Sequence, residues 1–257
     1  MLWDLIREQA VGMLSINPRL SDYLNSYILD FDDFNDALAF HVAEHLGKQV
    51  RQIDIKCWFS EVLAANPSIY QATEKDILKL VTVNPACPDE LTGLLTSRGI
   101  IAAAAQRISH CIYLTGDVRS AALVQSWIAL QMNIDIHPAA VLGAGLFIDH
   151  GIGIVIGETA IVEDDVSIWH GVTLGSTLRE AGDRHPKIRR GALLCAGSSV
   201  LGNIEIGEGA IVAANAVVTK TVPAKVIVAG CPGKVLGAVP DELNTLTSKT
   251  VKNKEFS

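Results

Sequence analysis

The sequence is poor in aromatic residues and in charge. Aromatic side chains make up 5% of the 257 residues and charged side chains 19%, whereas 49% of the residues are hydrophobic. This balance excludes an intrinsically disordered chain. The shortage of aromatics disfavours a thick core built on large rings, and the supply of small and β-branched residues favours the thin, repetitive walls of a solenoid.

Basic charge is scarce as well. The net charge of -7 and the pI near 5.5 disfavour nucleic acid or an anionic membrane as a partner, because both require a basic footprint. No run reaches the roughly 18 uncharged apolar residues of a membrane helix, and no secretory signal is evident at the start. We therefore expect no nucleic-acid partner, no membrane contact and a cytoplasmic location.

The five cysteines are scattered, and none forms a CxxC pair. An odd number without paired spacing is typical of reduced thiols in the cytoplasm. We expect neither a disulfide nor a structural zinc site. The cysteines are Cys57, Cys87, Cys111, Cys195 and Cys231.

The first half of the chain has a helical rhythm. Apolar residues recur three or four positions apart from Leu2 to about Gln131, which predicts an all-helical domain over residues 1–132. The segment Thr73-Glu74-Lys75-Asp76 resembles a helix start with acidic residues in its first turn. Residues Gly99 to Met132 should form one or two long helices.

After Asn133 the period changes to six residues. Such a period predicts a parallel β-helix over residues 133–236, in which three short strands make one triangular coil and stacked aliphatic side chains fill the interior. The fold class is therefore α+β, with a flexible tail over 237–257. The interruption before Ile188 predicts an extruded loop that carries Asp183-Arg184-His185-Pro186-Lys187. The predicted inward residues are Ile136, Leu142, Ile148, Ile156, Val162, Ile168, Leu174, Ile188, Leu194, Val200, Ile206, Val212 and Val218.

Two of the seven histidines are the most suggestive, and each has an acidic residue close by in the sequence. His150 follows Asp149, and His185 lies two residues after Asp183. A histidine oriented by a carboxylate can take a proton from an alcohol near neutral pH, as acyl transfer requires. Asp135 would approach His150 from the adjacent coil. Spacing alone leaves open whether His150 is a base or an exposed corner residue.

Four motifs carry a resemblance to a known family. They begin at Asp135 (DIHPAA), Asp149 (DHGIGIVIGET), Val172 (VTLG) and Gly182 (GDRHPKI). In this order, behind a helical domain, they closely resemble serine O-acetyltransferases, and the resemblance runs from about Trp3 to Leu236. It implies that the β-helix is left-handed and that the enzyme transfers acetyl from acetyl-CoA to L-serine, a step of cysteine biosynthesis.

The resemblance also implies roles for individual residues. The substrate hydroxyl attacks the thioester directly, with His150 as base and Asp135 as its orienting carboxylate. His185 assists catalysis, while Asp149 and Arg184 bind the amino acid, as does the position of Asn84. Coenzyme A lies in a groove between neighbouring chains of a trimer or a dimer of trimers. The positions that match its binding residues are Gly175, Ala196, Ala214, Lys220 and Lys234. Small residues such as Ala196 and Ala214 also suit the corners of the coils, and Lys234 could equally be a solvated charge.

The sequence departs from the family at several positions. Asn84 replaces an aspartate that helps to hold the substrate ammonium, and its carbonyl could still accept a hydrogen bond. Ile101 replaces a histidine, and residues 175–182 are bulkier than the usual glycine-rich stretch. The end Lys254-Glu255-Phe256-Ser257 lacks the isoleucine that the family inserts into its sulfhydrylase partner, so we expect no tight complex with that enzyme.

Other functions compete with this interpretation. The acceptor could be another hydroxylated amino or hydroxy acid, or the chain could be an inactive scaffold or regulator. A γ-class carbonic anhydrase would use histidines such as His150, His170 and His185 to hold zinc. The segment from His41 to His45 matches HxxEH, which in metalloproteases binds zinc, but it lies in a predicted amphipathic helix without a third ligand. We expect no metal.

Overall fold

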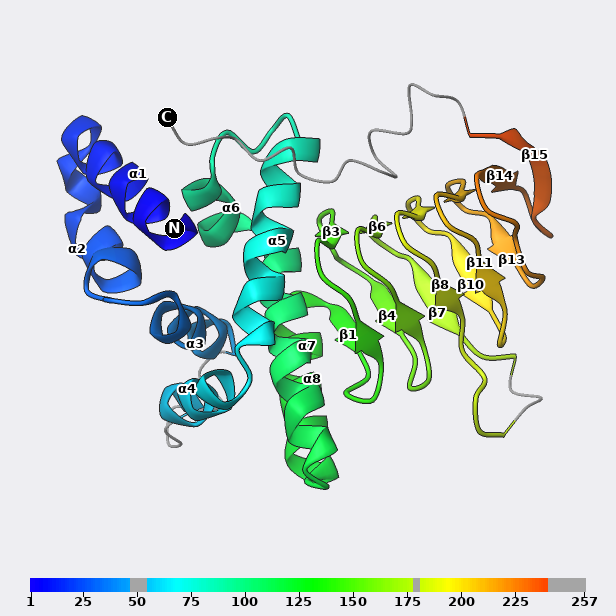
Figure 1. Ribbon diagram of the computed structural model, residues 1–257, viewed down its shortest axis with the longest axis horizontal. Helices are drawn as coiled ribbons and strands as arrows, with labels where there is room; N and C mark the ends of the chain where they lie inside the picture. Colours follow the sequence, from blue (N-terminus) through cyan, green and yellow to red (C-terminus); the bar gives the residue numbers. More distant parts are fainter. Residues whose placement is uncertain (47–54, 178–180, 240–257) are drawn as a thin grey trace.

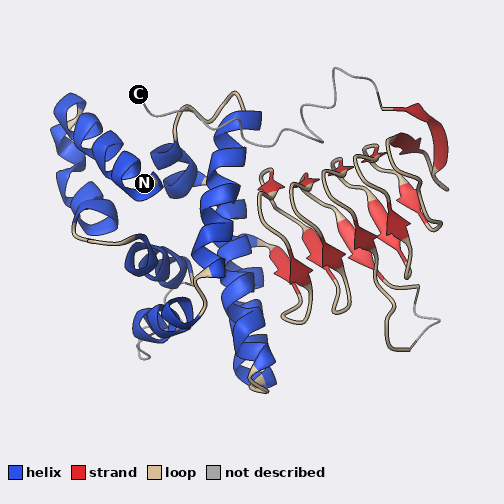
Figure 2. Cartoon of the chain, in the orientation of Figure 1, coloured by secondary structure: helices blue, strands red, loops and turns tan. Residues whose placement is uncertain are grey.

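The computed structural model describes residues 1–46, 55–177 and 181–239, and it divides into a helical half and a β-solenoid (Figure 1). Figure 2 shows that helices occupy the first half and strands the second. The helical half holds α1 (Leu2–Ile16), η1 (Pro18–Leu20), α2 (Ser21–Leu24), η2 (Asn25–Leu29), α3 (Phe34–His45), α4 (Ile55–Ala65), α5 (Ser68–Val83), α6 (Glu90–Thr96), α7 (Arg98–Leu114) and α8 (Val118–Met132).

Polar caps define several of these helices. Asp33, Asp89, Ser97 and Asp117 precede α3, α6, α7 and α8, and each side chain accepts the backbone N–H of the residue three positions on. The predicted helix start at Thr73 is wrong, because α5 already begins at Ser68. Thr73 donates its hydroxyl to the Ile69 carbonyl inside that helix.

The second half is the predicted β-solenoid. Its strands form three sheets that run along the coils, in the orders β1-β4-β7-β10-β13, β11-β8-β5-β2 and β15-β14-β12-β9-β6-β3. The strands are β1 (Ile134–Ile136), β2 (Val141–Leu142), β3 (Phe147–Ile148), β4 (Ile154–Ile156), β5 (Ile161–Val162), β6 (Ser167–Ile168), β7 (Thr173–Gly175), β8 (Lys187–Ile188), β9 (Leu193–Leu194), β10 (Ser199–Leu201), β11 (Glu205–Ile206), β12 (Ile211–Val212), β13 (Val217–Val218), β14 (Val226–Ala229) and β15 (Lys234–Ala238).

The strand register matches the six-residue pattern. Ile136 pairs with Ile156, which pairs with Leu174, and the other two sheets stack the predicted residues in the same way. Twelve of the thirteen predicted residues are buried, and Leu142 is half-buried. The architecture of the predicted fold is therefore confirmed. The strand β15 includes Gly237 and Ala238, and the backbone N–H of Val239 donates to the Lys225 carbonyl at 2.9 Å. Residues 240–257 of the predicted tail lie outside the described part of the chain.

Buried polar contacts join the two halves. The Arg107 guanidinium of α7 donates to Asp76 Oδ2 of α5 at 2.6 Å and to the Gly143 carbonyl of the first coil. The backbone N–H of Leu146 donates to the same Asp76 carboxylate at 2.7 Å, and burial raises the pKa of Asp76 although Arg107 opposes that shift. At Gly99 of α7 a Cβ would lie 2.3 Å from the Ile148 carbonyl oxygen, so the helix packs directly on the coil.

No helix within residues 1–46, 55–177 and 181–239 combines the length and the apolar character needed to cross a bilayer. Cys87, Cys111, Cys195 and Cys231 are free thiols.

Candidate active site

One corner of the solenoid carries the predicted base. We name the turns that join the six-stranded sheet to the five-stranded sheet, residues 149–153, 169–172, 195–198 and 213–216, the His150 corner. Because Ile148, Ile168, Leu194 and Val212 are in register, the residues that follow by two positions stack as one column along this corner. The column consists of His150, His170, Ala196 and Ala214.

A cavity of about 350 Å³ lies where the helical half meets this corner. The helical half contributes polar side chains, including Asn84 at the end of α5 and Arg98 at the start of α7, and the corner contributes Asp149 and His150. The complete lining is Leu80, Asn84, Ala86, Cys87, Thr92, Thr96, Ser97, Arg98, Ile148, Asp149, His150 and Ile152.

His150 is accessible and has a carboxylate close to it. Its side chain is 71% exposed, and its Nε2 lies 3.6 Å from Asp149 Oδ2. Its backbone φ of 56° is in the left-handed region, as are those of the coil residues Asp165 and Asn215, so this conformation belongs to the solenoid turns. An exposed imidazole beside a carboxylate at the rim of a cavity suits proton transfer from a bound alcohol.

Asp135 lies beside the same corner. It is on β1, in the first coil of the solenoid. The carbonyl of Asn133, just before β1, accepts the backbone N–H of Gly153 at 2.6 Å and so joins β1 to the turn that contains His150. The Asp135 carboxylate accepts a hydrogen bond from the Gln125 side chain at 2.6 Å. The carboxylate that pairs with His150 is that of Asp149, so the orienting role of Asp135 stays a prediction.

Asn84 offers a different group from the one expected. Its side-chain oxygen accepts the backbone N–H of Ala86 at 3.0 Å. Because an N–H can donate only to the oxygen of the amide, the NH₂ group of Asn84 lies on the other side of the side chain. Asn84 therefore has an NH₂ group free to donate, and its oxygen keeps a second lone pair that can accept a further hydrogen bond. Ile101, the other predicted change, is 2% exposed and does not line this cavity.

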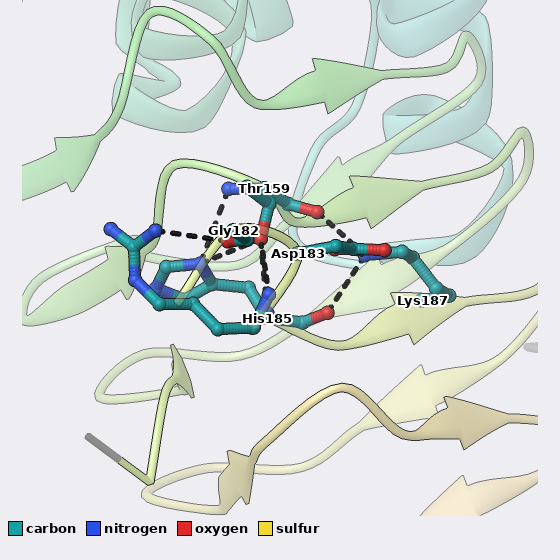
Figure 3. Close-up of polar contacts among 6 residues, drawn as sticks. Thr159, Gly182, Asp183, His185 and Lys187 are labelled. Carbon is teal, nitrogen blue, oxygen red and sulfur yellow. Dashed lines mark hydrogen bonds and ion pairs between the residues drawn. The ribbon is translucent and has the colours of Figure 1, made fainter. Parts of the chain in front are cut away.

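A second corner holds the other predicted site residues. We name the turns at the opposite edge of the five-stranded sheet, residues 137–140, 157–160 and the described part of 176–186, the His185 corner. Arg184 donates to Glu158 at 2.6 Å and to the Gly182 carbonyl at 3.1 Å. Lys187 donates to Asp183 at 2.6 Å and to the Thr159 carbonyl at 2.7 Å (Figure 3).

Thr159 organises this corner. Its hydroxyl oxygen accepts the backbone N–H groups of Arg184 and His185, each at 3.0 Å. The backbone N–H of Thr159 donates to His185 Nδ1 at 3.2 Å, and its hydroxyl lies 2.9 Å from the same nitrogen (Figure 3). Nδ1 is therefore the acceptor, so the hydrogen of the neutral ring is on Nε2. The ring lies against Gly157, where a Cβ would be 2.1 Å from Nε2.

His185 is kept neutral by its surroundings. The residue is 6% exposed, and burial together with the Arg184 charge lowers the pKa of its imidazole, although Glu158 raises it. The hydrogen bond from Arg184 lowers the pKa of Glu158. His185 is thus suited to donate a hydrogen bond through Nε2 rather than to act as a base near pH 7.

The two corners lie at opposite edges of the five-stranded sheet, so one chain does not bring all predicted site residues together. Asn84, Asp149 and His150 share a cavity, whereas Arg184 and His185 belong to the other corner. The predicted coenzyme positions are divided between the two corners as well. Ala196 and Ala214 are in the His150 column. Gly175 ends β7 and Lys220 follows β13, both toward the His185 corner, whereas Lys234 begins β15.

Sequence reasoning missed three residues of the His185 corner and one residue of the cavity. Thr159, Glu158 and Gly157 shape the His185 corner, and Arg98 lines the cavity. Gly157-Glu158-Thr159 is part of the motif that begins at Asp149, so the resemblance could have indicated these three residues as part of the site. Nothing in the local sequence around Arg98 distinguishes it from a solvated cation.

The histidines of the two competing metal-site hypotheses do not gather into a metal site among the described residues. His41 is buried and its Nε2 lies 3.0 Å from the Tyr27 carbonyl, while His45 Nδ1 lies 2.7 Å from the His41 carbonyl, so both rings of the HxxEH segment are engaged by the backbone. The rings of His150 and His170 are 5.9 Å apart, but His185 is at the other corner. No group of three potential metal ligands occurs among the residues whose placement is described.

Comparison with known proteins identifies the family. The profile described as "Serine acetyltransferase, N-terminal" matches residues 2–105, and "Bacterial transferase hexapeptide (six repeats)" matches 185–220. A putative serine acetyltransferase of Schizosaccharomyces pombe is 44% identical over 98% of this chain and 94% of its own length. The chain belongs to the serine acetyltransferase family.

Solved structures of this family agree with the fold. Serine acetyltransferase from Brucella abortus in complex with coenzyme A superposes with a TM-score of 0.90 at 40% identity, covering 93% of this chain and 96% of that one. Soybean serine acetyltransferase complexed with serine gives a TM-score of 0.87 at 36% identity, covering 91% and 97%. Both solved structures cover the helical half and the β-solenoid of this chain.

Proposed function

We propose that the protein transfers acetyl from acetyl-CoA to the hydroxyl of L-serine, with His150 as the general base. One observation carries the proposal: in a chain of this family, an exposed imidazole paired with Asp149 stands at the rim of a cavity of about 350 Å³. Relatives are named serine acetyltransferases, and the structures of two of them contain coenzyme A or serine.

The reaction needs a single proton carrier. The serine hydroxyl oxygen attacks the thioester carbonyl carbon while its proton moves to His150. The carbon–sulfur bond then breaks, and the coenzyme A thiolate leaves with the proton that His150 held. Asp149 stabilises the imidazolium in between. A neutral Nε2–H donor such as His185 would stabilise the oxyanion or the bound substrate.

We further propose that Arg184 and His185 of a neighbouring subunit complete each site. Two features support a trimer or a dimer of trimers: the corners lie apart in one chain, and the five-stranded sheet between them exposes Val155, which is 42% accessible. Light scattering at micromolar concentration should give a multiple of three chains. Mixing His150→Ala with His185→Ala subunits should restore sites that neither variant has alone. A monomer, or a mixture without restored activity, contradicts this assembly.

A panel assay tests the substrate. Thiol release from acetyl-CoA is followed with L-serine, L-homoserine, L-threonine and glycerate. Preference for L-serine supports the proposal. If another alcohol turns over and L-serine does not, the acceptor is wrong and acetyl transfer stands. Release with none of them favours the inactive scaffold.

A further inference from the structure

One wall of the cavity beside His150 is formed by α6 and the residues that flank it. The residues of this stretch that line the cavity are Cys87, Thr92, Thr96, Ser97 and Arg98. Asn84, at the end of α5, lines the cavity just before this stretch. The position of α6 therefore determines where this wall stands relative to the solenoid.

α6 is too short to hold this position by itself. It has seven residues, and isolated helices of that length are not stable in water. Leu91 and Leu94 are buried, and Gly93 lies so close to α5 that a Cβ there would be 3.2 Å from Leu80 Cδ2. Such apolar contacts are non-directional, so they keep α6 in the core without fixing its first turn.

Gln9 of α1 binds the first turn of α6 through both polar atoms of its amide. Its Oε1 accepts the backbone N–H of Leu91 at 2.9 Å, and its Nε2 donates to Glu90 Oε2 at 2.7 Å. The first N–H groups of a helix have no partner within the helix, so Gln9 supplies one from another element. The amide provides both the acceptor that Leu91 requires and the donor that Glu90 requires.

α1 presents Gln9 from a fixed position. Trp3, Ile6 and Ala10 of α1 are buried in the core, and Ile6 lies three positions before Gln9, on the same face of the helix. Glu90 is 8% exposed, and a hydrogen bond to a carboxylate that is shielded from water is stronger than one between neutral groups. The contact between Gln9 and Glu90 therefore restrains α6 more than an exposed pair would.

The turn between α5 and α6 connects the start of α6 to the cavity. The Asp89 side chain caps α6 by accepting the Thr92 N–H at 2.7 Å. The Cys87 thiol donates to the Asp89 carbonyl at 3.4 Å, and the Cys87 N–H donates to the Asn84 carbonyl at 3.0 Å. A displacement of the start of α6 therefore moves Cys87 and Asn84, which both line the cavity.

We propose that Gln9 is a positioning residue, which holds the start of α6 and so keeps the cavity in the shape that binds the acceptor. The inference rests on the proposed acetyl transfer. Gln9 is not among the residues that line the cavity, so it acts through α6. His150 belongs to the solenoid, on the other side of the cavity, so loss of the Gln9 contacts changes acceptor binding more than proton transfer.

Two substitutions of Gln9 test this role. Gln9→Glu keeps an acceptor for the Leu91 N–H but places a second carboxylate against Glu90, and Gln9→Met keeps the length of the side chain with neither hydrogen bond. Each should raise KM for L-serine about tenfold, because the wall is displaced, and should leave kcat and KM for acetyl-CoA within about twofold. Gln9→Met keeps the test decisive if the charged variant does not fold.

An exchange of the two partners separates position from stability. In a double variant that carries Gln9→Glu and Glu90→Gln the donor and the acceptor change places, so the contact forms again and KM for L-serine should return to within about twofold of the wild-type value. Gln131→Glu adds the same charge to an exposed residue of α8 that does not line the cavity, and should leave each KM unchanged. Unchanged KM for L-serine in both Gln9 variants, a rise that the exchange does not reverse, or an equal rise for acetyl-CoA overturns the proposal.

Hydrogen exchange separates this inference from the proposed reaction. The backbone N–H of Leu91 should exchange about tenfold faster in Gln9→Met than in the wild type, since it loses its acceptor, and at the wild-type rate in the double variant. If exchange changes in this way but the wild type releases no thiol with any alcohol of the panel, the proposed reaction falls and the hold of Gln9 on α6 stands. If thiol is released and KM for L-serine does not follow the exchange rate, the reaction stands and the positioning role falls. Equal exchange in the wild type and in Gln9→Met overturns the hold itself.

Discussion

The His150 corner and the His185 corner use similar residue types in opposite ways. At the first, His150 is 71% exposed, and its Nε2 lies 3.6 Å from Asp149 Oδ2. At the second, His185 is 6% exposed and its Nδ1 is held by Thr159. The exposed imidazole of His150 is available to a substrate, whereas the buried and hydrogen-bonded side chains of the His185 corner fix the shape of that corner.

His150→Ala tests the open corner and should have the largest effect. Removing a general base costs about 10²- to 10⁴-fold in rate, so kcat for acetyl transfer should fall by at least two orders of magnitude while the melting temperature stays unchanged. His170→Ala is the matched control, because it removes the same ring from the next position of the same column. Near-wild-type turnover in His150→Ala would show that another group accepts the proton.

His41 extends the comparison to a buried histidine of the helical half. Burial lowers the pKa of His41 to about 4, and its Nδ1 has no hydrogen-bond partner. Because the pKa of His41 in the fold lies below the ordinary histidine value of 6.5, the stability that neutral His41 contributes is present above pH 6.5 and is lost as pH falls toward 4.

The free energy of unfolding should therefore drop by about 3 kcal/mol on account of this one residue across that window. Denaturant titrations of the wild type and of His41→Gln, which keeps a donor for the Tyr27 carbonyl, measure the difference. If the free energy of unfolding changes with pH in the same way for both proteins, the prediction is wrong, and His41 is either protonated in the folded protein or accessible to water.

Thr159→Val tests the bonded corner. The substitution keeps the shape of the side chain but removes the acceptor of two backbone N–H groups, which should cost about 1 to 2 kcal/mol of stability. It should lower kcat/KM about tenfold, since the ring of His185 loses a partner. Thr159→Ser should keep both properties.

The tautomer of His185 gives a readout that a loss of stability alone would not change. Nitrogen NMR of the wild type should show the ring hydrogen on Nε2 at neutral pH, and Thr159→Val, which keeps the backbone N–H that donates to Nδ1, should retain this tautomer. A wild-type ring with its hydrogen on Nδ1 contradicts the arrangement in Figure 3.

Glu158→Gln should have the smallest effect on stability. The side chains of the Arg184–Glu158 pair are 30% and 37% exposed, and ion pairs in such positions contribute little. The melting temperature should change by no more than about one or two degrees, as expected for a few tenths of a kcal/mol. A larger drop would mean that the bonded corner depends on this charge pair more than on Thr159.

The fold was predictable from the sequence because it repeats. Each of the thirteen aliphatic residues makes the same contact as its equivalent one coil away, so the period alone identified the interior. The site was only partly predictable. Asn84 lines the cavity beside His150, and the hydrogen bond that it accepts from the Ala86 N–H depends on a local turn. Arg98 lines the cavity because α7 packs against the solenoid, and this contact between segments distant in the sequence cannot be predicted from the residues around Arg98.

The contacts between Arg107 and the first coil have a consequence for assembly along the solenoid axis. A stack of parallel strands exposes unpaired backbone groups at both ends, and such ends can add further strands without limit. At the first coil, side chains of α7 occupy carbonyls of the turns, with Arg107 on Gly143 and Gln106 on Ala140. At the last coil, β15 returns antiparallel to β14 and ends the parallel register. The α7 side chains at the first coil and the antiparallel strand β15 at the last coil therefore occupy backbone groups at both ends of the repeat, which disfavours the addition of further coils from another molecule.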